Sequence, residues 1–329
     1  MQLLAGDIGG TKTLLALYRR TPDGQVVEVR RARFVSRDFH GLAQVVRLFL
    51  AEDGAQVQAA AFGVAGPVHE GQCTATNLPW RLDSAGLARE LGIPALQLLN
   101  DFHAVGLAIP VLGREDLCVL QDRPRAQTGP LAILGAGTGL GQALLLPSGQ
   151  GALRALPSEG GHTDFAPRND TEITLLRFLL RRHHRVSYER VVSGPGIVTL
   201  YEFVTEQGLA PRSPSLAARF HEQDPAAVIS QAALQGEDVA AEKAIDLFIS
   251  LYGAEAGNLA LKVLPTGGLF IAGGIAPRLL PKMQAPAFLQ AFTDKGRMSP
   301  LLEAMYVAVI QNTDVGLLGA REAALRAHA

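Results

Sequence analysis

The sequence predicts an α/β protein in two halves, each built on a mixed sheet flanked by helices. Two stretches are alike: residues 3–18 and residues 131–146 each run from an apolar strand through a glycine-rich turn into a second apolar strand. Both halves then continue with short apolar strands that lead into segments with helical spacing of apolar residues, which is typical of such sheets. At 329 residues the chain is long enough for two domains or one large α/β unit.

Strands and helices alternate in the first half. Besides the strands around the first turn, short apolar runs predict strands at residues 26–35, 59–65 and 96–99. Helical spacing predicts helices at residues 40–52, 84–91 and 104–109. We expect Ser84 to cap the second of these helices, because its hydroxyl can accept a hydrogen bond from a free backbone N–H.

The second half repeats the scheme with longer insertions. A polar loop is expected at residues 156–168, and Asn169 to Glu172 resemble a capping box for the helix that follows. A buried strand ends at Gly273 and Gly274, a third glycine turn before a helical stretch. The boundary between the halves is inferred near residue 110 from the repeat. The predicted helices of this half are 173–183, 193–207, 224–233, 238–264 and 313–327, and its buried strand is 268–272.

Composition narrows the class of protein. Hydrophobic residues make up 48% and charged residues 19% of the chain, as in ordinary soluble globular proteins. A net charge of −1, without a basic stripe interleaved with aromatic residues, argues against a nucleic-acid partner. No apolar stretch approaches the about 20 residues of a spanning helix, and no signal peptide is apparent. Cys73 and Cys118 are too few for a disulfide framework or a cysteine-rich zinc site, so we expect two buried thiols and a cytoplasmic protein.

The two glycine-rich turns, Gly6 to Lys12 and Gly135 to Gly141, are the first candidates for chemistry. Glycines allow positive φ and close approach of the backbone to an anion, so that N–H groups can point at phosphate oxygens. Asp7 adds a carboxylate that could hold a metal ion or its waters. Both turns join two strands, which excludes a Walker A loop and a Rossmann site. One turn alone could be a simple hairpin, but the pair predicts a two-sided phosphate clamp, in which Lys12 is either a phosphate partner or an exposed strand lysine.

Asn100 and Asp101 follow a predicted strand directly. Ligands of open α/β sheets gather beyond the carboxyl ends of the strands. An aspartate at that place can accept the proton of a hydroxyl that attacks a γ-phosphate, while the asparagine holds a neighbouring hydroxyl. The alternative is that these residues only cap the next helix.

A third candidate site lies in the loop Pro157 to His162. The two glycines between Glu159 and His162 present both side chains from one tight loop, and a carboxylate with an imidazole suits adjacent sugar hydroxyls. The alternative is a polar surface turn, whereas a zinc site lacks a third clustered ligand. Glu189, taken alone, indicates no function, because a glutamate is common near the start of a helix.

Together these residues resemble the bacterial glucokinase family, within the actin/hexokinase/sugar-kinase superfamily. The likeness runs nearly from end to end of the chain. The motifs that carry it are GDIGGTK (6–12), TNLPW (76–80), LLNDFHAVGLAIP (98–110), GAGTGLG (135–141), PSEGGHTDFAP (157–167), ERVVSGPG (189–196), FIAGGI (270–275), DKGR (294–297) and NTDVGLLGA (312–320).

The resemblance implies a two-domain actin-like ATPase fold, of the ribonuclease H-like type, with duplicated mixed sheets and a central cleft. Residues 1–110 with 301–329 would form the smaller domain, and residues 111–300 the larger one. It further implies a cytoplasmic homodimer that uses ATP and Mg²⁺ to phosphorylate D-glucose at its 6-hydroxyl, giving glucose 6-phosphate.

The resemblance also implies a role for individual residues. Asp101 would be the general base, and Asp7 would act on Mg²⁺ through water. The residues that match the glucose site are Asn100, Asp101, Glu159, His162 and Glu189. Those that match the nucleotide site are Asp7, Gly9, Gly10, Thr11, Gly137, Thr138, Gly139, Gly273 and Gly274.

One residue departs from the commoner family pattern. Lys12 stands where many relatives of the enterobacterial type carry asparagine, as it does in the ROK (repressor, open reading frame, kinase) branch, although the cysteine-rich zinc motif of that branch is absent here. Other readings stay open: a kinase for mannose, fructose or N-acetylglucosamine, one that uses polyphosphate or ADP, or a sugar-responsive regulator. The regulator would need a DNA-binding helix-turn-helix, and no extension for it precedes the strand at Leu3.

Overall fold

The computed structural model describes residues 1–52, 54–75, 78–148 and 153–327. The chain forms two compact units. Unit 1 comprises Met1–Arg114, Ala155–Pro157 and Asn312–Ala329, and unit 2 comprises Glu115–Arg154 and Ser158–Gln311. Whether the units behave as the two predicted domains stays a prediction.

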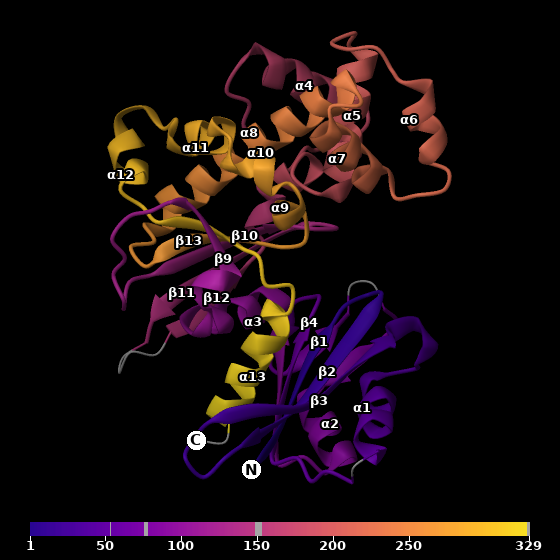
Figure 1. The fold of residues 1–329 in the computed structure, drawn as a ribbon, viewed down its shortest axis with the longest axis vertical. Helices are drawn as coiled ribbons and strands as arrows, with labels where there is room; N and C mark the ends of the chain where they lie inside the picture. Colours follow the sequence, from indigo (N-terminus) through magenta and orange to yellow (C-terminus); the bar gives the residue numbers. More distant parts are fainter. Residues whose placement is uncertain (53, 76–77, 149–152, 328–329) are drawn as a thin grey trace. The chain divides into compact units, whose positions relative to one another are not determined.

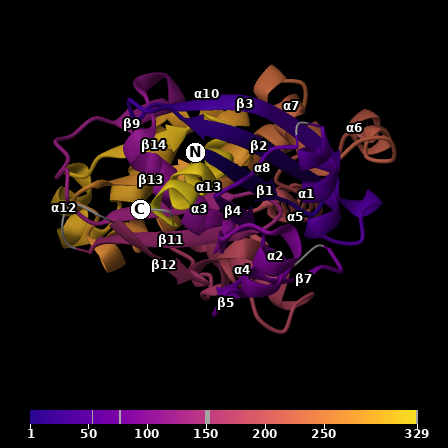
Figure 2. The ribbon, with the colours of Figure 1, turned by 90° about the horizontal axis from the view of Figure 1, so that it is seen from below.

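Unit 1 is built on a five-stranded mixed sheet in the order β3-β2-β1-β4-β8 (Figure 1). The strands are β1 (Gln2–Ile8), β2 (Lys12–Arg20), β3 (Val26–Val35), β4 (Ala59–Val64) and β8 (Ala95–Asn100). Strands β1, β4 and β8 run parallel, so their carboxyl ends meet at one edge, where Ile8, Val64 and Asn100 share a row of the register. Strands β2 and β3 complete the sheet with antiparallel pairing, and β3 forms its outer edge (Figure 2).

Helices cover both faces of this sheet, because successive strand residues point to opposite sides. Leu4 and Ile8 belong to the core on the side of α1 (Leu42–Ala51) and α2 (Ser84–Leu91). Leu3 and Ala5 belong to the core on the side of α3 (Asp101–Ala108) and α13 (Val315–Ala327). Figure 1 shows the two helix pairs on either side of the strands. A small separate sheet is formed by β5 (Val68–His69), β6 (Gln72–Thr74) and β7 (Arg81–Asp83).

Helix α13 packs closely on α3, with a glycine at the closest approach. A Cβ on Gly319 would lie 1.6 Å from the carbonyl oxygen of Ala104, a separation at which one helix must shift. We therefore expect Gly319→Ala to lower the free energy of unfolding by about 3 kcal/mol, at the upper end of overpacking costs. Urea unfolding followed by circular dichroism measures this. Gly41→Ala is the control, because nothing lies within 4 Å of a Cβ there; equal effects of the two substitutions would contradict the packing argument.

Unit 2 is built on a six-stranded mixed sheet in the order β12-β11-β10-β13-β14-β9. Strands β10, β13 and β14 run parallel, while β11 and β9 pair antiparallel to their neighbours. The long helix α8 packs with α5, α7 and α11 and carries much of the core. The strands are β9 (Leu117–Gln121), β10 (Leu131–Ala136), β11 (Leu140–Pro147), β12 (Leu153–Ser158), β13 (Gly268–Ala272) and β14 (Val307–Ile310). The helices are α4 (Asp170–Leu180), α5 (Gly194–Glu206), α6 (Pro214–Arg219), α7 (Pro225–Gln235), α8 (Val239–Val263), α9 (Ile275–Arg278), α10 (Leu280–Gln284), α11 (Pro286–Thr293) and α12 (Ser299–Glu303).

The predicted repeat is confirmed. In each unit a hairpin surrounds the glycine-rich turn, β1–β2 in one and β10–β11 in the other, and its first strand pairs parallel with a later strand. The mixed α/β class is confirmed with it. Among the described residues, no helix is both long enough and apolar enough to cross a membrane.

Most predicted elements are confirmed within a few residues, and the exceptions have local causes. The helix expected at 104–109 begins at Asp101, because Asn100 caps it. The cap of α2 is Asp83 rather than Ser84, since the Asp83 side chain accepts the Gly86 N–H at 2.9 Å. The loop expected from residue 156 begins as strand β12. Strands β5, β6, β7, β9 and β14 were not predicted. In the motif at 76–80, the first two residues lie outside the described residues.

Candidate active site

Asn100 ends β8 at the carboxyl edge of the unit 1 sheet. Its Oδ1 accepts the backbone N–H groups of Phe102 (3.0 Å) and His103 (3.3 Å), and its Nδ2 donates to the carbonyl oxygen of Gly66 (3.1 Å). Asn100 therefore caps the next helix, which was the alternative to a role in ligand binding; the cap does not exclude that role. Because an amide nitrogen carries two hydrogens, at most one remains for a ligand. Asn100 can thus offer a sugar one donated hydrogen bond while it keeps α3 in place.

Asp101 occupies the first turn of α3, and its Oδ1 accepts the Phe102 N–H at 3.0 Å. Burial raises the pKa of Asp101 to about 6; the Phe102 hydrogen bond opposes the rise and the nearby Asp7 carboxylate adds to it. A carboxylate with a pKa close to neutral pH can both hold and release a proton under working conditions. The position therefore suits a general base.

Asp7 lies near the end of β1, beside the start of α13. A Cβ on Gly316 would be 3.3 Å from the Asp7 carboxyl carbon, a tight contact, so the backbone of α13 comes close to this carboxylate. Burial raises the pKa of Asp7, Lys12 lowers it, and Asp314 raises it again. Because Asp7 interacts electrostatically with both Asp101 and Asp314, unit 1 gathers acidic groups at this edge.

The acidic groups at this edge can be compared with the ligands that a magnesium ion requires. Mg²⁺ is usually bound by one or two carboxylates and substrate phosphates, and it keeps several waters. A buried carboxylate such as Asp7, whose pKa is raised first by burial and further by the nearby Asp314, gains from the positive charge of such an ion. The described part of the chain contains no set of three acidic, histidine or cysteine side chains placed to enclose a metal. The residues present therefore fit an ion held at Asp7 through water.

The first glycine-rich turn is held by a residue that the sequence did not point to, Ser36. The turn closes with a hydrogen bond from Gly9 N–H to the Lys12 carbonyl oxygen (2.9 Å). Ser36, which is fully buried, donates its hydroxyl to the carbonyl oxygen of Gly9 (2.8 Å) and its N–H to that of Thr11 (3.1 Å). Ser36 therefore fixes the direction of two peptide groups of the turn. Lys12 is exposed at the start of β2.

The glycines of the two turns do not adopt the positive φ that glycine allows. Among the described residues, left-handed φ occurs at other glycines, for example Gly273 (φ 82°), and not at the glycines of either turn. Both turns are tight hairpin turns without that conformation, and each contains a short backbone hydrogen bond: Gly9 N–H to the Lys12 oxygen in one and Gly137 N–H to the Gly139 oxygen (2.8 Å) in the other. The third glycine turn does require glycine, since a Cβ on Gly273 would lie 2.4 Å from the Ala136 oxygen.

The second turn opens onto a pocket of about 730 Å³ within unit 2. Gly137 accepts the N–H of Gly194 at 2.8 Å, which ties the turn to the start of α5. Of the predicted nucleotide residues, Gly137, Thr138 and Gly274 line this pocket, whereas Gly139 and Gly273 do not. The structure thus brings the second and third glycine turns to one cavity.

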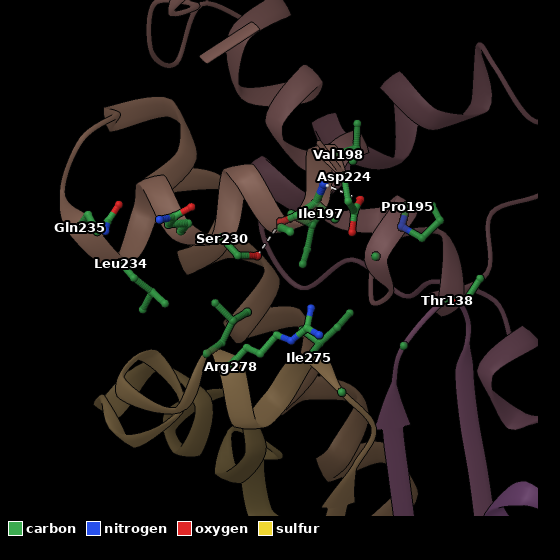
Figure 3. A pocket seen from close by; sticks show the side chains of 17 residues that line it. Thr138, Pro195, Ile197, Val198, Asp224, Ser230, Leu234, Gln235, Ile275 and Arg278 are labelled. Carbon is green, nitrogen blue, oxygen red and sulfur yellow. Dashed lines mark hydrogen bonds between the residues drawn. The ribbon is translucent and has the colours of Figure 1, made fainter. Parts of the chain in front are cut away.

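The rest of the pocket wall was not predicted. It comes from the start of α5, from α7 and from α9, and most of its side chains are apolar. Figure 3 shows Thr138 at one end, Leu234 and Gln235 at the other, and Arg278 across from Ser230. Asp224 caps α7 at the rim. Apolar side chains at helical spacing looked like ordinary core in the sequence, so no local signal separated these from buried residues.

The predicted sugar loop lies directly on strand β11. Gly160–His162 form a short 3₁₀ turn, closed by a hydrogen bond from His162 N–H to the Glu159 carbonyl oxygen (2.9 Å). A Cβ on Gly161 would be 1.9 Å from the Leu140 oxygen, so the loop can approach the strand only with glycine there. The side chains of Glu159 and His162 are exposed.

Glu189 joins this loop to the second glycine-rich turn. Its Oε2 accepts the N–H of Leu140, the residue after Gly139, at 3.0 Å. Its Oε1 lies 3.8 Å from Nδ1 of His162. Glu189 was unremarkable in the sequence, but in the structure it contacts both the second glycine-rich turn and the predicted sugar loop.

Comparisons with known proteins agree along the whole length. The family model described as glucokinase matches residues 4–327. The chain belongs to the glucokinase family. A glucokinase of Nostoc sp. (strain PCC 7120) is 48% identical, over 98% of this chain and 99% of its own. The crystal structure of a glucokinase from an Antarctic psychrotroph has a TM-score of 0.86 and 31% identity and covers 99% of both chains.

The predicted resemblance to bacterial glucokinases is therefore confirmed, and so is the actin-like sugar-kinase fold. A ROK family glucokinase from Streptomyces griseus, solved in complex with glucose and AMPPNP, shares that fold with a TM-score of 0.68 at 20% identity. As a member of the glucokinase family, this chain is an enzyme. The roles of its individual site residues stay predictions. Asp7, Gly9, Gly10, Thr11, Asn100 and Asp101 belong to unit 1, and the other predicted site residues belong to unit 2.

Proposed function

We propose that this chain transfers the γ-phosphoryl group of ATP to the 6-hydroxyl of D-glucose, with Asp101 as the general base. Membership of the glucokinase family over residues 4–327 carries the proposal. Asp101 supports it, because a partly buried carboxylate with a pKa of about 6 stands at the carboxyl edge of the unit 1 sheet. Asp101 takes the proton of the attacking hydroxyl as the new O–P bond forms.

The groups proposed to bind glucose are Asn100 and Asp101, which belong to unit 1, and Glu159, His162 and Glu189, which belong to unit 2. Asn100 donates one amide hydrogen, since its other polar positions are engaged. Glu159 and Glu189 accept hydrogen bonds from sugar hydroxyls, and His162 donates or accepts one. The 3.8 Å separation of His162 and Glu189 lets adjacent hydroxyls of one sugar ring engage both side chains.

ATP is held by the glycine-rich turns and by the unit 2 pocket. Backbone N–H groups of the turns and the Thr138 hydroxyl bind phosphate oxygens. A largely apolar cavity of about 730 Å³ suits a nucleoside, which polyphosphate lacks. Asp7 holds Mg²⁺ through water, and that ion, when bound, neutralises charge on the transferred phosphoryl group.

We propose further that the enzyme is a cytoplasmic homodimer.

A coupled assay for ADP release tests the proposal. With Mg·ATP, we expect turnover that depends on glucose, and little turnover with mannose, fructose or N-acetylglucosamine. Polyphosphate should not replace ATP, because it leaves the nucleoside pocket empty. Turnover without sugar, or equal turnover with another hexose, would refute the assignment of glucose, and full activity with polyphosphate would refute the role of the pocket. Light scattering after size exclusion measures whether two chains associate.

A further inference from the structure

One sequence motif, DKGR at 294–297, has no part in the proposed chemistry. Its lysine, Lys295, reaches helix α8, where its Nζ donates to Oδ1 of Asn258 (2.8 Å) and to the carbonyl oxygen of Ala254 (3.1 Å). The stem of Lys295 crosses Gly257, at which a Cβ would lie 2.6 Å from the lysine Cε. This seat desolvates the ammonium group, which lowers the pKa of Lys295. Because burial of an ammonium group is unfavourable by itself, the position of Lys295 depends on its contacts with α8.

Asn258 also contacts a fully buried glutamate, Glu255. The Asn258 Nδ2 donates to Oε2 of Glu255 at 3.0 Å. The other carboxylate oxygen of Glu255 accepts Nε2 of Gln142, on strand β11, at 2.7 Å. Both oxygens therefore receive amide N–H donors. Burial raises the pKa of Glu255, and these two hydrogen bonds oppose the rise and favour the ionised carboxylate. The positive charge of Lys295, which donates to the same Asn258 amide, also favours the ionised form of Glu255.

Two branches lead from these residues to the proposed sugar site. In the first, Nδ2 of Asn258 also donates to the hydroxyl of Tyr188 at 3.0 Å. Tyr188 immediately precedes Glu189, and its N–H donates to the carbonyl oxygen of Thr163, just after the sugar loop (3.0 Å). The Asn258 contact thus holds the backbone that carries Glu189.

In the second branch, Gln142 lies under the sugar loop. A Cβ on Gly160 would be 2.0 Å from Oε1 of Gln142, so the loop backbone rests against this amide. The Glu255 hydrogen bond fixes which way the Gln142 amide faces, with its oxygen toward Gly160. A substitution of Glu255 would therefore shift Gln142 and, with it, the loop backbone that carries Glu159 and His162.

We propose that Lys295, Asn258 and Glu255 are positioning residues for sugar recognition: they hold Glu189 and the Glu159–His162 loop in the geometry that binds the acceptor. This inference rests on the proposed function. Lys295 sets the direction of the Asn258 amide, since only the oxygen of that amide can accept from an ammonium group. The correct direction then turns the nitrogen toward Glu255 and Tyr188.

The test is Lys295→Met, which removes the ammonium group and keeps the apolar stem over Gly257. Because hydrogen bonds to charged groups contribute strongly, we expect the KM for glucose to rise about tenfold and the KM for ATP to change less than about twofold. Lys295→Arg should restore much of the glucose KM. Lys282→Met is the matched control: Lys282 also contacts α8, through Asp246 (2.7 Å), but neither residue contacts Asn258, Glu255 or the sugar loop. Its glucose KM should stay at the wild-type value.

Three results would overturn the inference. An unchanged glucose KM in Lys295→Met shows that the lysine does not position the site. Equal rises in the KM for glucose and for ATP, or a lower melting temperature with unchanged KM values, indicate a merely structural role. The wild-type enzyme separates this from the proposed function: if it releases no ADP in response to glucose, both fail, whereas an active wild type beside an unaffected Lys295→Met variant refutes the positioning role alone.

Discussion

Asp101→Asn should lower kcat at least ~100-fold, because the amide cannot accept the proton of the attacking hydroxyl. Its oxygen can still accept the Phe102 N–H, so the start of α3 should be retained. Coupled ADP-release kinetics measure the loss. The matched control is Asp170→Asn: Asp170 also stands in the first turn of a helix, directly after an asparagine cap, but it is exposed and outside the site. Near-normal turnover of the Asp101 variant would refute the assignment of the base.

The same substitution should raise the melting temperature at pH 7. Burial lifts the pKa of Asp101 from 3.8 to about 6, so the folded state binds its proton more tightly than the unfolded state does. By linkage, stability falls as the pH rises between these two values, and the ionised carboxylate destabilises the fold above them. The amide introduced by Asp101→Asn carries no such charge, so the gain should vanish below about pH 4. Thermal unfolding at several pH values measures it.

The raised pKa also predicts the pH profile of the wild type. The general base must be ionised, so kcat/KM should fall as the pH drops below about 6, the pKa of Asp101. This profile reports groups of the free enzyme. An inflection near pH 4 instead would contradict the effect of burial on this carboxyl group.

Glu189 should show the second large effect, and two substitutions separate its contacts. Glu189→Gln keeps an oxygen for the Leu140 N–H but removes the charge beside His162. We expect its glucose KM to rise at least about tenfold, since a charged acceptor is lost, while the KM for ATP is unchanged. Glu189→Ala also removes the acceptor for Leu140, so the second glycine-rich turn loses a contact and the KM for ATP should rise as well.

Steady-state kinetics with each substrate varied in turn test this split. Glu202→Gln serves as the control, because Glu202 pairs with Arg182 on an exposed surface of the same unit. If the glutamine variant raised both KM values equally, the two contacts of Glu189 would not be separable, and its assignment to the sugar would be wrong.

Features that depend on neighbours in the chain were predicted well. The hairpins around the two glycine-rich turns, the cap at Asn169 and the helix that starts after Ser193 form as expected. Each depends on residues within a few positions of one another, which hydrophobic spacing and side-chain chemistry reveal directly. The cap at Asp83 was missed for a small reason of the same kind, because Asp and Ser stood side by side and both can cap.

Features that depend on distant residues were not predicted. Ser36 contacts the first turn although it lies 25 residues after Thr11 in the chain. No sequence motif near either residue indicates this contact. The wall of the unit 2 pocket and the buried Glu255 also looked like ordinary helix positions. Even Asn100, correctly singled out, has less free hydrogen-bonding capacity than the sequence suggested, because the cap and Gly66 use most of it.

The sequence by itself determined the α/β class, the two hairpins and the family, because motifs and local periodicity survive in the order of the residues. Only the tertiary structure decided how the candidate groups behave. The pKa of Asp101 depends on desolvation and on Asp7, which lies more than ninety residues earlier in the chain. The link from Glu189 to Leu140 and His162 depends on strand β11 passing beneath the sugar loop. Desolvation and electrostatic interaction act through space, and the order of residues along a chain does not state those distances.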